Sequence, residues 1–251
     1  MNRFSLDGSR AFVTGANTGI GQAIAVDLAG HGAEVIAVGR SSMDETLAAV
    51  SDVGGTVIPL KADLGTVAGA TDAFTQALER TGPVDILVNN AGIIRRADSL
   101  DFTEEDWDAV MQINLKVVFF LSQAFAKARI AAGQGGSIIN IASLLSFQGG
   151  IRIPSYTASK SGMAGLTKTL SNEWSAQGIT VNAVAPGYVV SNNTEALRTD
   201  PARNQAILER IPLGRWAEPN DISGAVTYLA SPAARYVTGI TLPVDGGWLG
   251  R

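Results

Sequence analysis

The stretch VTGANTGIGQAIA, residues 13–25, is the part of the sequence that decides the fold prediction. It begins inside a short apolar run, AFVT at 11–14, and it opens a segment of helical length. Gly15, Gly19 and Gly21 lie at the junction with the spacing G-x-x-x-G-x-G. Glycines at such a junction allow a tight turn and let a pyrophosphate approach the free N–H groups of a helix start. A turn that needs glycine only for its own conformation is the alternative.

The rest of the chain repeats this order of strand and helix. Predicted strands lie at 11–14, 34–38, 56–60, 85–89, 137–142, 179–185 and 239–244, and helix-length segments at 19–31, 66–81, 104–132, 155–177 and 219–231. Most of the strands are apolar on both sides of their alternation, which is typical of parallel strands covered on both faces.

This pattern predicts an α/β fold with a Rossmann-like, doubly wound parallel sheet and helices on both faces. We expect a single dinucleotide-binding and catalytic domain over residues 1–251, because no linker or shift in composition divides the chain. The mostly polar stretch 188–215 interrupts the alternation after a predicted strand and is expected to form a substrate lid.

The composition limits the possible functions. The chain of 251 residues has a net charge of −4, no cysteine and one histidine, His31. It therefore has no disulfide or cysteine nucleophile, and we expect no metal site. Without a block of lysines or arginines, neither nucleic acid nor a membrane is an expected partner. We expect no signal peptide and no apolar run as long as a membrane span, which indicates a cytoplasmic protein.

The residue after the second predicted strand bears on the choice between two nicotinamide cofactors. A carboxylate at this position holds the ribose 2′-hydroxyl, whereas an arginine accommodates a 2′-phosphate. This chain has VGRSS there, with Arg40 and no acidic residue. Arg40 therefore favours NADP over NAD, although an arginine that only lies in a solvated loop would leave NAD open.

Tyr156 and Lys160, in the run YTASK, are four residues apart and share one face of a helix. A phenol with its ordinary pKa near 10 is a weak base at neutral pH, and a nearby ammonium group is expected to lower that pKa. The pair can thus exchange a proton in a chain with hardly any histidine. Ser143 lies thirteen residues before the tyrosine, and Asn114 lies in the predicted helix 104–132.

Together these motifs resemble the short-chain dehydrogenase/reductase family over the full chain. The matching pieces, in order, are TGANTGIG, Asp63 in KADL, NNAG at 89–92, Asn114, Ser143, YTASK at 156–160 and PG at 186–187. The resemblance implies an oxidoreductase that uses NADP or NAD. It implies that Tyr156 is the acid–base residue and that Lys160 both tunes it and binds the cofactor ribose. Ser143 would hydrogen-bond the substrate oxygen, and Asn114 would hold a water molecule.

The same resemblance, together with the glycine loop and Arg40, gives the expected cofactor contacts. They are Gly15, Asn17, Thr18, Gly19, Ile20, Gly21, Arg40, Asp63, Leu64, Asn90, Ala91, Gly92, Tyr156, Lys160, Pro186, Gly187, Val189 and Ser191.

Three local runs point to the substrate. NNAGIIRRADS at 89–99, SFQGGIRIPSY at 146–156 and PGYVVSNNTEALR at 186–198 are similar to family members that act on deoxy sugar acids of the 2-deoxy-D-gluconate or 2-dehydro-3-deoxy-D-gluconate type. Such a substrate needs polar groups for its hydroxyls and a cation for its carboxylate. The expected substrate contacts are Ser143, Gln148, Arg152, Asn192, Asn193 and Arg198. Arg152 is favoured for the carboxylate, with Arg198 or an arginine of the 89–99 run as alternatives.

Two other functions remain open on the same scaffold. One is a 3-oxoacyl carrier reductase, which would favour an apolar pocket and a basic docking surface. The other is a non-catalytic dinucleotide sensor, which would not need the tyrosine and lysine pair. The family resemblance also implies a homotetramer in which the helices 104–132 and 155–177 pair across a twofold axis.

Overall fold

Seven parallel strands form one sheet at the centre of the computed structural model, which describes residues 2–251. The strands are β1 Arg10–Thr14, β2 Glu34–Gly39, β3 Thr56–Lys61, β4 Ile86–Asn89, β5 Gly136–Ile141, β6 Ile179–Pro186 and β7 Thr241–Val244. Their order across the sheet is β3-β2-β1-β4-β5-β6-β7, and every neighbouring pair is parallel. The strand order reverses between β1 and β4, where the carboxyl ends of parallel strands leave a crevice for a ligand.

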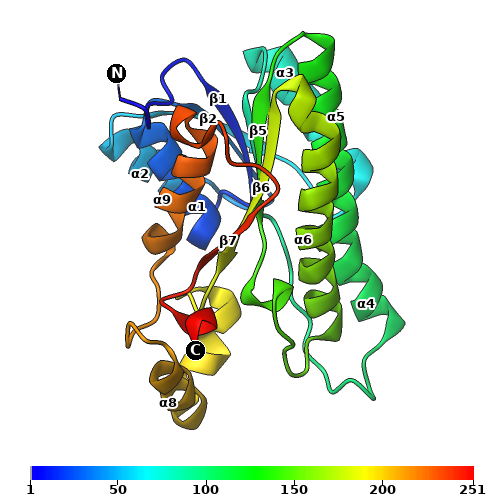
Figure 1. Ribbon diagram of the computed structural model, residues 1–251, viewed down its shortest axis with the longest axis vertical. Coiled ribbons are helices and arrows are strands. Elements are labelled where there is room, and N and C mark those ends of the chain that lie inside the picture. The colour runs from blue at the N-terminus through cyan, green and yellow to red at the C-terminus, as the bar shows by residue number, and fades with distance from the viewer. Residues whose placement is uncertain (1) are drawn as a thin grey trace.

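Helices cover both faces of this sheet (Figure 1). One layer contains α1 Gly19–Gly30, α2 Asp44–Asp52 and α9 Pro219–Ala230, and the other contains α3 Val67–Thr81, α5 Val118–Ala131 and α6 Pro154–Trp174. α4 Glu104–Met111 extends α5 beyond the sheet, and the short helices α7 Glu195–Arg198 and α8 Pro201–Arg210 lie in the segment after β6. This arrangement confirms the predicted doubly wound α/β fold.

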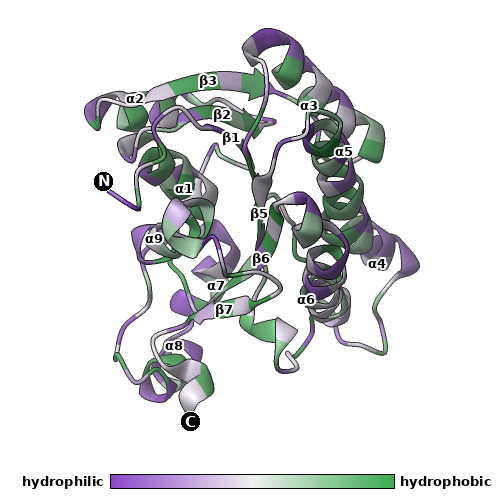
Figure 2. Cartoon of the chain, turned by 45° about the horizontal axis from the view of Figure 1, so that its top comes forward, coloured by the Kyte–Doolittle hydropathy of each residue, from purple (hydrophilic) through white to green (hydrophobic). Residues whose placement is uncertain are grey.

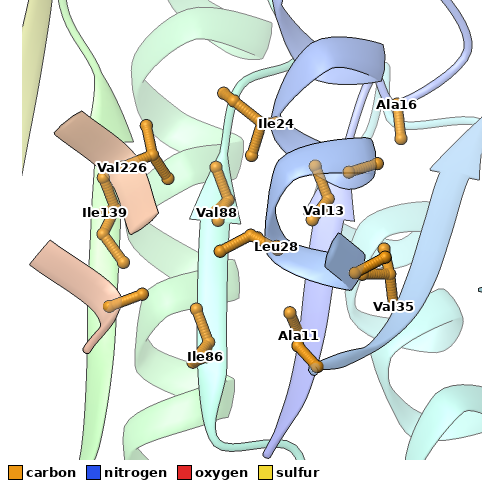
Figure 3. Packing of buried hydrophobic residues seen from close by; sticks show 14 of the residues in the cluster. Ala11, Val13, Ala16, Ile24, Leu28, Val35, Ile86, Val88, Ile139 and Val226 are labelled. Atoms are coloured by element: carbon orange, nitrogen blue, oxygen red, sulfur yellow. The ribbon is translucent and has the colours of Figure 1, made fainter. Parts of the chain in front are cut away.

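The core lies where strands from the middle of the sheet meet α1 and α9. Figure 3 shows Val13, Ile86, Val88 and Ile139 from the strands facing Ile24 and Leu28 of α1 and Val226 of α9. These side chains are almost fully buried, and burying a side chain of this size contributes about 1.5–3 kcal/mol. Because the opposite face of the same strands packs on α3, α5 and α6, both sides of each strand must be apolar, as the sequence indicates.

The predicted helix 104–132 is continuous, but it contains a π-helical turn, η1 Gln112–Val117, between α4 and α5. By length and composition the run Glu104–Ala131 could cross a membrane, with a mean hydropathy of 1.4 in its most apolar window. This corrects the expectation that no apolar run reaches that length. In the fold its side chains Val110, Leu121 and Phe125 are buried, and the last two belong to the core between α5 and the sheet.

The predicted lid begins and ends at the same edge of the sheet, after β6. Val189 pairs with Ala217 in an isolated parallel bridge, so the chain from 190 to 216 leaves and returns at the carboxyl end of β6. Near the return, Trp216 meets Tyr188 edge to face and Trp248 packs against it at a tilt. In Figure 2 helix α8 stands beside the C-terminus, outside the two helical layers.

Candidate active site

A cavity of about 780 Å³ opens at the carboxyl ends of β1, β4, β5 and β6. Every cofactor contact expected from the sequence, from Gly15 to Ser191, lines this cavity. The catalytic candidates Ser143, Tyr156 and Lys160 also line it, as do the substrate candidates Asn192, Asn193 and Arg198. Asn114, Gln148 and Arg152 are absent from its lining within residues 2–251. The topology therefore brings most of the predicted site residues to one place.

The glycine loop at the first strand end fits a dinucleotide. Gly15 and Gly19 have φ of +65° and +56°, a region that residues with a Cβ rarely adopt. A Cβ on Gly21 would stand 2.1 Å from the carbonyl oxygen of Gly15, so a side chain there would collide with the backbone. In the described chain α1 has neither a side-chain cap at Thr18 nor an acidic residue in its first turn. Its first N–H groups are thus free to bind phosphate oxygens.

Thr14 and Asn90 hold this loop against the next strand end. The Thr14 hydroxyl donates to the carbonyl of Val88 at 3.1 Å and accepts from the backbone N–H groups of Asn90 and Ala91. The Asn90 amide donates to the carbonyls of Thr14 and Gly15, at 2.9 Å and 3.2 Å. These hydrogen bonds hold the glycine loop in place before any ligand binds, which reduces the entropy cost of binding.

At the far end of the cavity, β2 ends at Gly39 and is followed by the exposed Arg40. Arg40 has no carboxylate within 4.0 Å in residues 2–251. Beside it the Ser41 hydroxyl accepts from the Asn17 amide at 2.8 Å. An unpaired guanidinium next to a hydroxyl suits a ribose 2′-phosphate.

The reacting end of the cavity lies between β5 and α6. Ser143 follows β5. Its hydroxyl accepts from the N–H of Leu145 at 3.2 Å and acts on the neighbouring Tyr156 hydroxyl by lowering its pKa. The Lys160 ammonium lies 5.6 Å from the centroid of the Tyr156 ring and donates to the carbonyl of Ile141 at 2.5 Å. Lys160 is only 4% exposed, so packing holds its side chain in the cavity wall.

Burial raises the pKa of the Tyr156 hydroxyl above its ordinary value, and the Ser143 hydrogen bond and the Arg96 charge oppose this only in part. Burial also lowers the pKa of Lys160 to about 8. The sequence suggested instead that lysine would lower the tyrosine pKa. Loss of hydration outweighs nearby charge because a phenolate is costly to bury. At neutral pH the tyrosine therefore holds its proton and can donate it to a carbonyl that is being reduced.

Asn114 lies behind the cavity wall, in the π-helical turn η1, and is completely buried. Its amide oxygen accepts from the N–H of Ile93 and its amide nitrogen donates to the carbonyl of the same residue, both at 2.9 Å. The nitrogen also lies 3.4 Å from the hydroxyl of Ser159, which precedes Lys160. Asn114 thus ties the segment after β4 to α6, and its role in holding a water stays a prediction.

Gln148 and Arg152 lie in the loop between Ser143 and α6 but not in the cavity lining, so their substrate roles stay predictions. The Gln148 side chain accepts a hydrogen bond from the indole of Trp248 at 3.2 Å. Arg152 has φ of +65° and pairs with the carboxylate of Asp98 at 3.0 Å. Arg198 lies in the cavity wall, and its Nε atom is buried with no hydrogen-bond partner in the described chain. Of the arginines weighed for the carboxylate, Arg198 is therefore the one that the cavity contains.

Several cavity residues were absent from the predicted site. They include Gly39, Ser41, Ile93, Ile141, Thr194 and Pro219. Apart from Pro219, which begins α9, each lies beside a residue that was predicted or at a strand end, so the positions of the strand ends could have indicated them.

Comparison with known proteins assigns the class. Residues 15–249 match a family model described as enoyl-(acyl carrier protein) reductase, and the relatives below span the whole chain. The chain belongs to the short-chain dehydrogenase/reductase family and is an NAD(P)-dependent oxidoreductase that acts on CH–OH and carbonyl groups. The family prediction is thereby confirmed.

The most similar proteins narrow this class. The chain is 52% identical to a 2-dehydro-3-deoxy-D-gluconate 5-dehydrogenase of Escherichia coli (strain K12), covering 100% of this chain and 99% of the relative. It is 50% identical to a protein of the same name from Bacillus subtilis (strain 168), covering 99% and 97%. A crystal structure from Agrobacterium tumefaciens with bound NADP, provisionally assigned as a 2-deoxy-D-gluconate 3-dehydrogenase, is 61% identical, with a TM-score of 0.96 and full coverage of both chains.

Proposed function

We propose that this protein transfers a hydride between NADP or NAD and the keto or hydroxyl carbon of a deoxy sugar acid. The substrate is of the 2-deoxy-D-gluconate or 2-dehydro-3-deoxy-D-gluconate type, which the names of the relatives support. The observation that carries the proposal is the composition of the cavity wall near Tyr156. Asn192, Asn193 and Arg198 offer amides and an unpaired cation there, which suits hydroxyls and a carboxylate.

The proposed roles follow from the geometry of the reacting end. The bound nicotinamide supplies or accepts the hydride. Tyr156 donates its proton to the substrate oxygen during reduction and takes one back during oxidation. Ser143, which lines the same cavity as the tyrosine, orients that oxygen. Lys160 holds the cofactor ribose, and Asn114 holds the cavity wall and a water.

A panel of ketones tests the substrate class. Oxidation of NADPH and NADH is followed by absorbance with the C5 ketone of 2-dehydro-3-deoxy-D-gluconate, with the uncharged amide of that ketone and with a 3-oxoacyl thioester. The proposal predicts the largest kcat/KM for the acid. A preference for the thioester would assign the protein to the acyl carrier reductases, and binding of cofactor with no turnover of any ketone would favour a sensor.

We propose NADP as the preferred cofactor because Arg40 is free to receive a phosphate. Replacing Arg40 with Asp should shift the preference toward NAD by about 1.5–3 kcal/mol, the range of a hydrogen bond to a charged group. The measurement is the ratio of kcat/KM for NADPH and NADH in wild type and variant. An equal loss with both cofactors, or none with either, would show that Arg40 is only a loop residue.

The carboxylate of the substrate is proposed to bind Arg198. Arg198→Gln should raise KM for the keto acid about tenfold or more, the effect of losing a charged hydrogen bond. KM for the uncharged amide should change much less. Arg152→Gln serves as the control, since its guanidinium already pairs with Asp98. If instead Arg152→Gln raised KM for the acid alone and Arg198→Gln did not, Arg152 rather than Arg198 would bind the carboxylate.

We further propose a cytoplasmic homotetramer whose partners are the small-molecule substrate and copies of itself, with no nucleic acid or membrane partner. Trp107 on α4 and Ile130 on α5 are 39% and 42% exposed, and Tyr236 and Ile240 are exposed before β7. A closed assembly of twofold symmetry would cover such apolar groups. Light scattering should give the mass of four chains, and a monomer mass at micromolar concentration would contradict it.

A further inference from the structure

Two arginines hold one turn of the lid from different sides. The turn is η4 Asn192–Thr194, which Ser191 begins with a capping box. Arg96, from the segment after β4, donates from Nη2 to the carbonyl of Asn193 at 2.8 Å. Arg198, from the lid itself, directs Nη2 to the carbonyl of Ser191 at 3.4 Å. The two positive charges therefore meet carbonyls that are two residues apart.

Neither arginine has an acidic partner. Their neighbours do: Arg95 pairs with Asp106 at 3.1 Å and Arg152 with Asp98 at 3.0 Å. Across residues 2–251, no carboxylate lies within 4.0 Å of the Arg96 or Arg198 guanidinium. Each guanidinium carries five N–H donors, and the contacts above use one of them on each residue. Two like charges on one turn repel each other, and an anion between them would relieve this repulsion.

Within residues 2–251 Arg96 is not in the lining of the cavity, but Asn193, whose carbonyl it contacts, lines the same cavity as Tyr156 and Arg198. The charge of Arg96 also lowers the pKa of the Tyr156 hydroxyl, against the larger effect of burial. The phosphate-binding amides of α1 are at a different strand end, after β1. An anion bound near Arg96 would thus be part of the substrate rather than the cofactor pyrophosphate.

We infer that Arg96 is a positioning residue that fastens the lid turn at Asn193 and, together with Arg198, makes lid closure depend on a substrate carboxylate. This inference rests on the proposed function for the identity of the acid. A neutral substrate would leave the two cations unpaired under the closed lid, whereas a carboxylate would join them.

The test compares Arg96→Gln and Arg96→Lys with Arg95→Gln, a matched control that removes the adjacent guanidinium from its ion pair with Asp106. The first measurement is hydrogen exchange of residues 191–200 in the NADPH complex, which needs no substrate. Exchange should be faster in Arg96→Gln than in wild type and unchanged in Arg95→Gln. Unchanged exchange in Arg96→Gln would overturn the inference that Arg96 fastens the lid turn.

The second measurement is kcat/KM for the keto acid and for its amide. Arg96→Gln should lower the ratio of acid to amide about tenfold, as expected when one charged hydrogen bond is lost. Arg96→Lys should restore part of it, and the affinity for NADPH should stay as in wild type. An equal loss for acid and amide, or a weakened affinity for NADPH with the ratio unchanged, would overturn the inference. If wild type reduced neither compound, the proposed function would fail. Hydrogen exchange would still decide whether Arg96 fastens the lid turn at Asn193.

Discussion

Replacing Tyr156 with Phe should reduce kcat by about 10²–10⁴, the usual contribution of a general acid, while NADPH still binds. The ring remains and only the hydroxyl is lost, so the packing of α6 around Ser155 and Ser159 is preserved. Without the hydroxyl, the proposed proton donor for the new alkoxide is gone. Reduction would then have to draw its proton from water.

The measurements are single-turnover NADPH oxidation and the NADPH dissociation constant from nucleotide fluorescence. Ser143→Ala is the companion variant, because it keeps the tyrosine proton but removes the hydroxyl that is proposed to orient the substrate oxygen. Its kcat should fall less than that of Tyr156→Phe. A phenylalanine variant that kept most of its rate would remove Tyr156 from the mechanism.

Lys160→Ala should have the second largest effect and should reduce both turnover and cofactor affinity. The variant deletes a buried ammonium, leaves the carbonyl of Ile141 without its donor and opens a void beneath the tyrosine. A lost hydrogen bond to a charged group corresponds to about 1.5–3 kcal/mol in cofactor binding. Lys160→Met, which fills the void without the charge, separates packing from electrostatics: it should restore stability but not affinity.

The pKa of Lys160 gives this prediction a pH dependence. With the pKa of Lys160 lowered to about 8, the ammonium is present below that pH and is lost above it. Since the charged form donates the stronger hydrogen bonds to an anionic or hydroxylated ligand, NADPH affinity in wild type should fall as pH rises through about 8. The dissociation constant of Lys160→Met should show no such change. A wild-type affinity that is flat over this range would contradict the role of the ammonium.

The fold could be predicted because its determinants are local. Strands such as β5 and β6 are apolar on both sides since helices cover both faces, and this is visible in the sequence. The glycine loop is equally clear, because Gly21 packs on the backbone of Gly15 and no other residue fits there. The π-helical turn within 104–132 was missed, since hydrophobic periodicity does not distinguish one widened turn from a regular helix.

The site was predictable only where residue type and spacing determine position. Ser143, Tyr156 and Lys160 are brought together by one strand end and one helix, so their approach follows from the topology. The choice of Arg152 relied on its nearness in sequence to Tyr156. Its side chain instead pairs with Asp98, a contact between distant segments that spacing cannot reveal.

The direction of the tyrosine pKa shift was missed for a related reason. Nearby charge can be inferred from a helical spacing of four residues, but the loss of water around the phenol depends on the whole cavity wall. In the structure this loss is the larger effect on Tyr156.

The central claim is that a hydride moves between the nicotinamide and a carbon of a deoxy sugar acid. The most direct test is to incubate the enzyme with the C5 ketone of 2-dehydro-3-deoxy-D-gluconate and NADPH carrying deuterium at both C4 positions of the dihydronicotinamide, and to locate the deuterium by NMR. We predict deuterium on a newly formed carbinol carbon of the sugar acid, and no transfer by Tyr156→Phe on the same time scale. A sugar acid free of deuterium, together with a labelled hydroxyacyl thioester in a parallel reaction, would contradict the account.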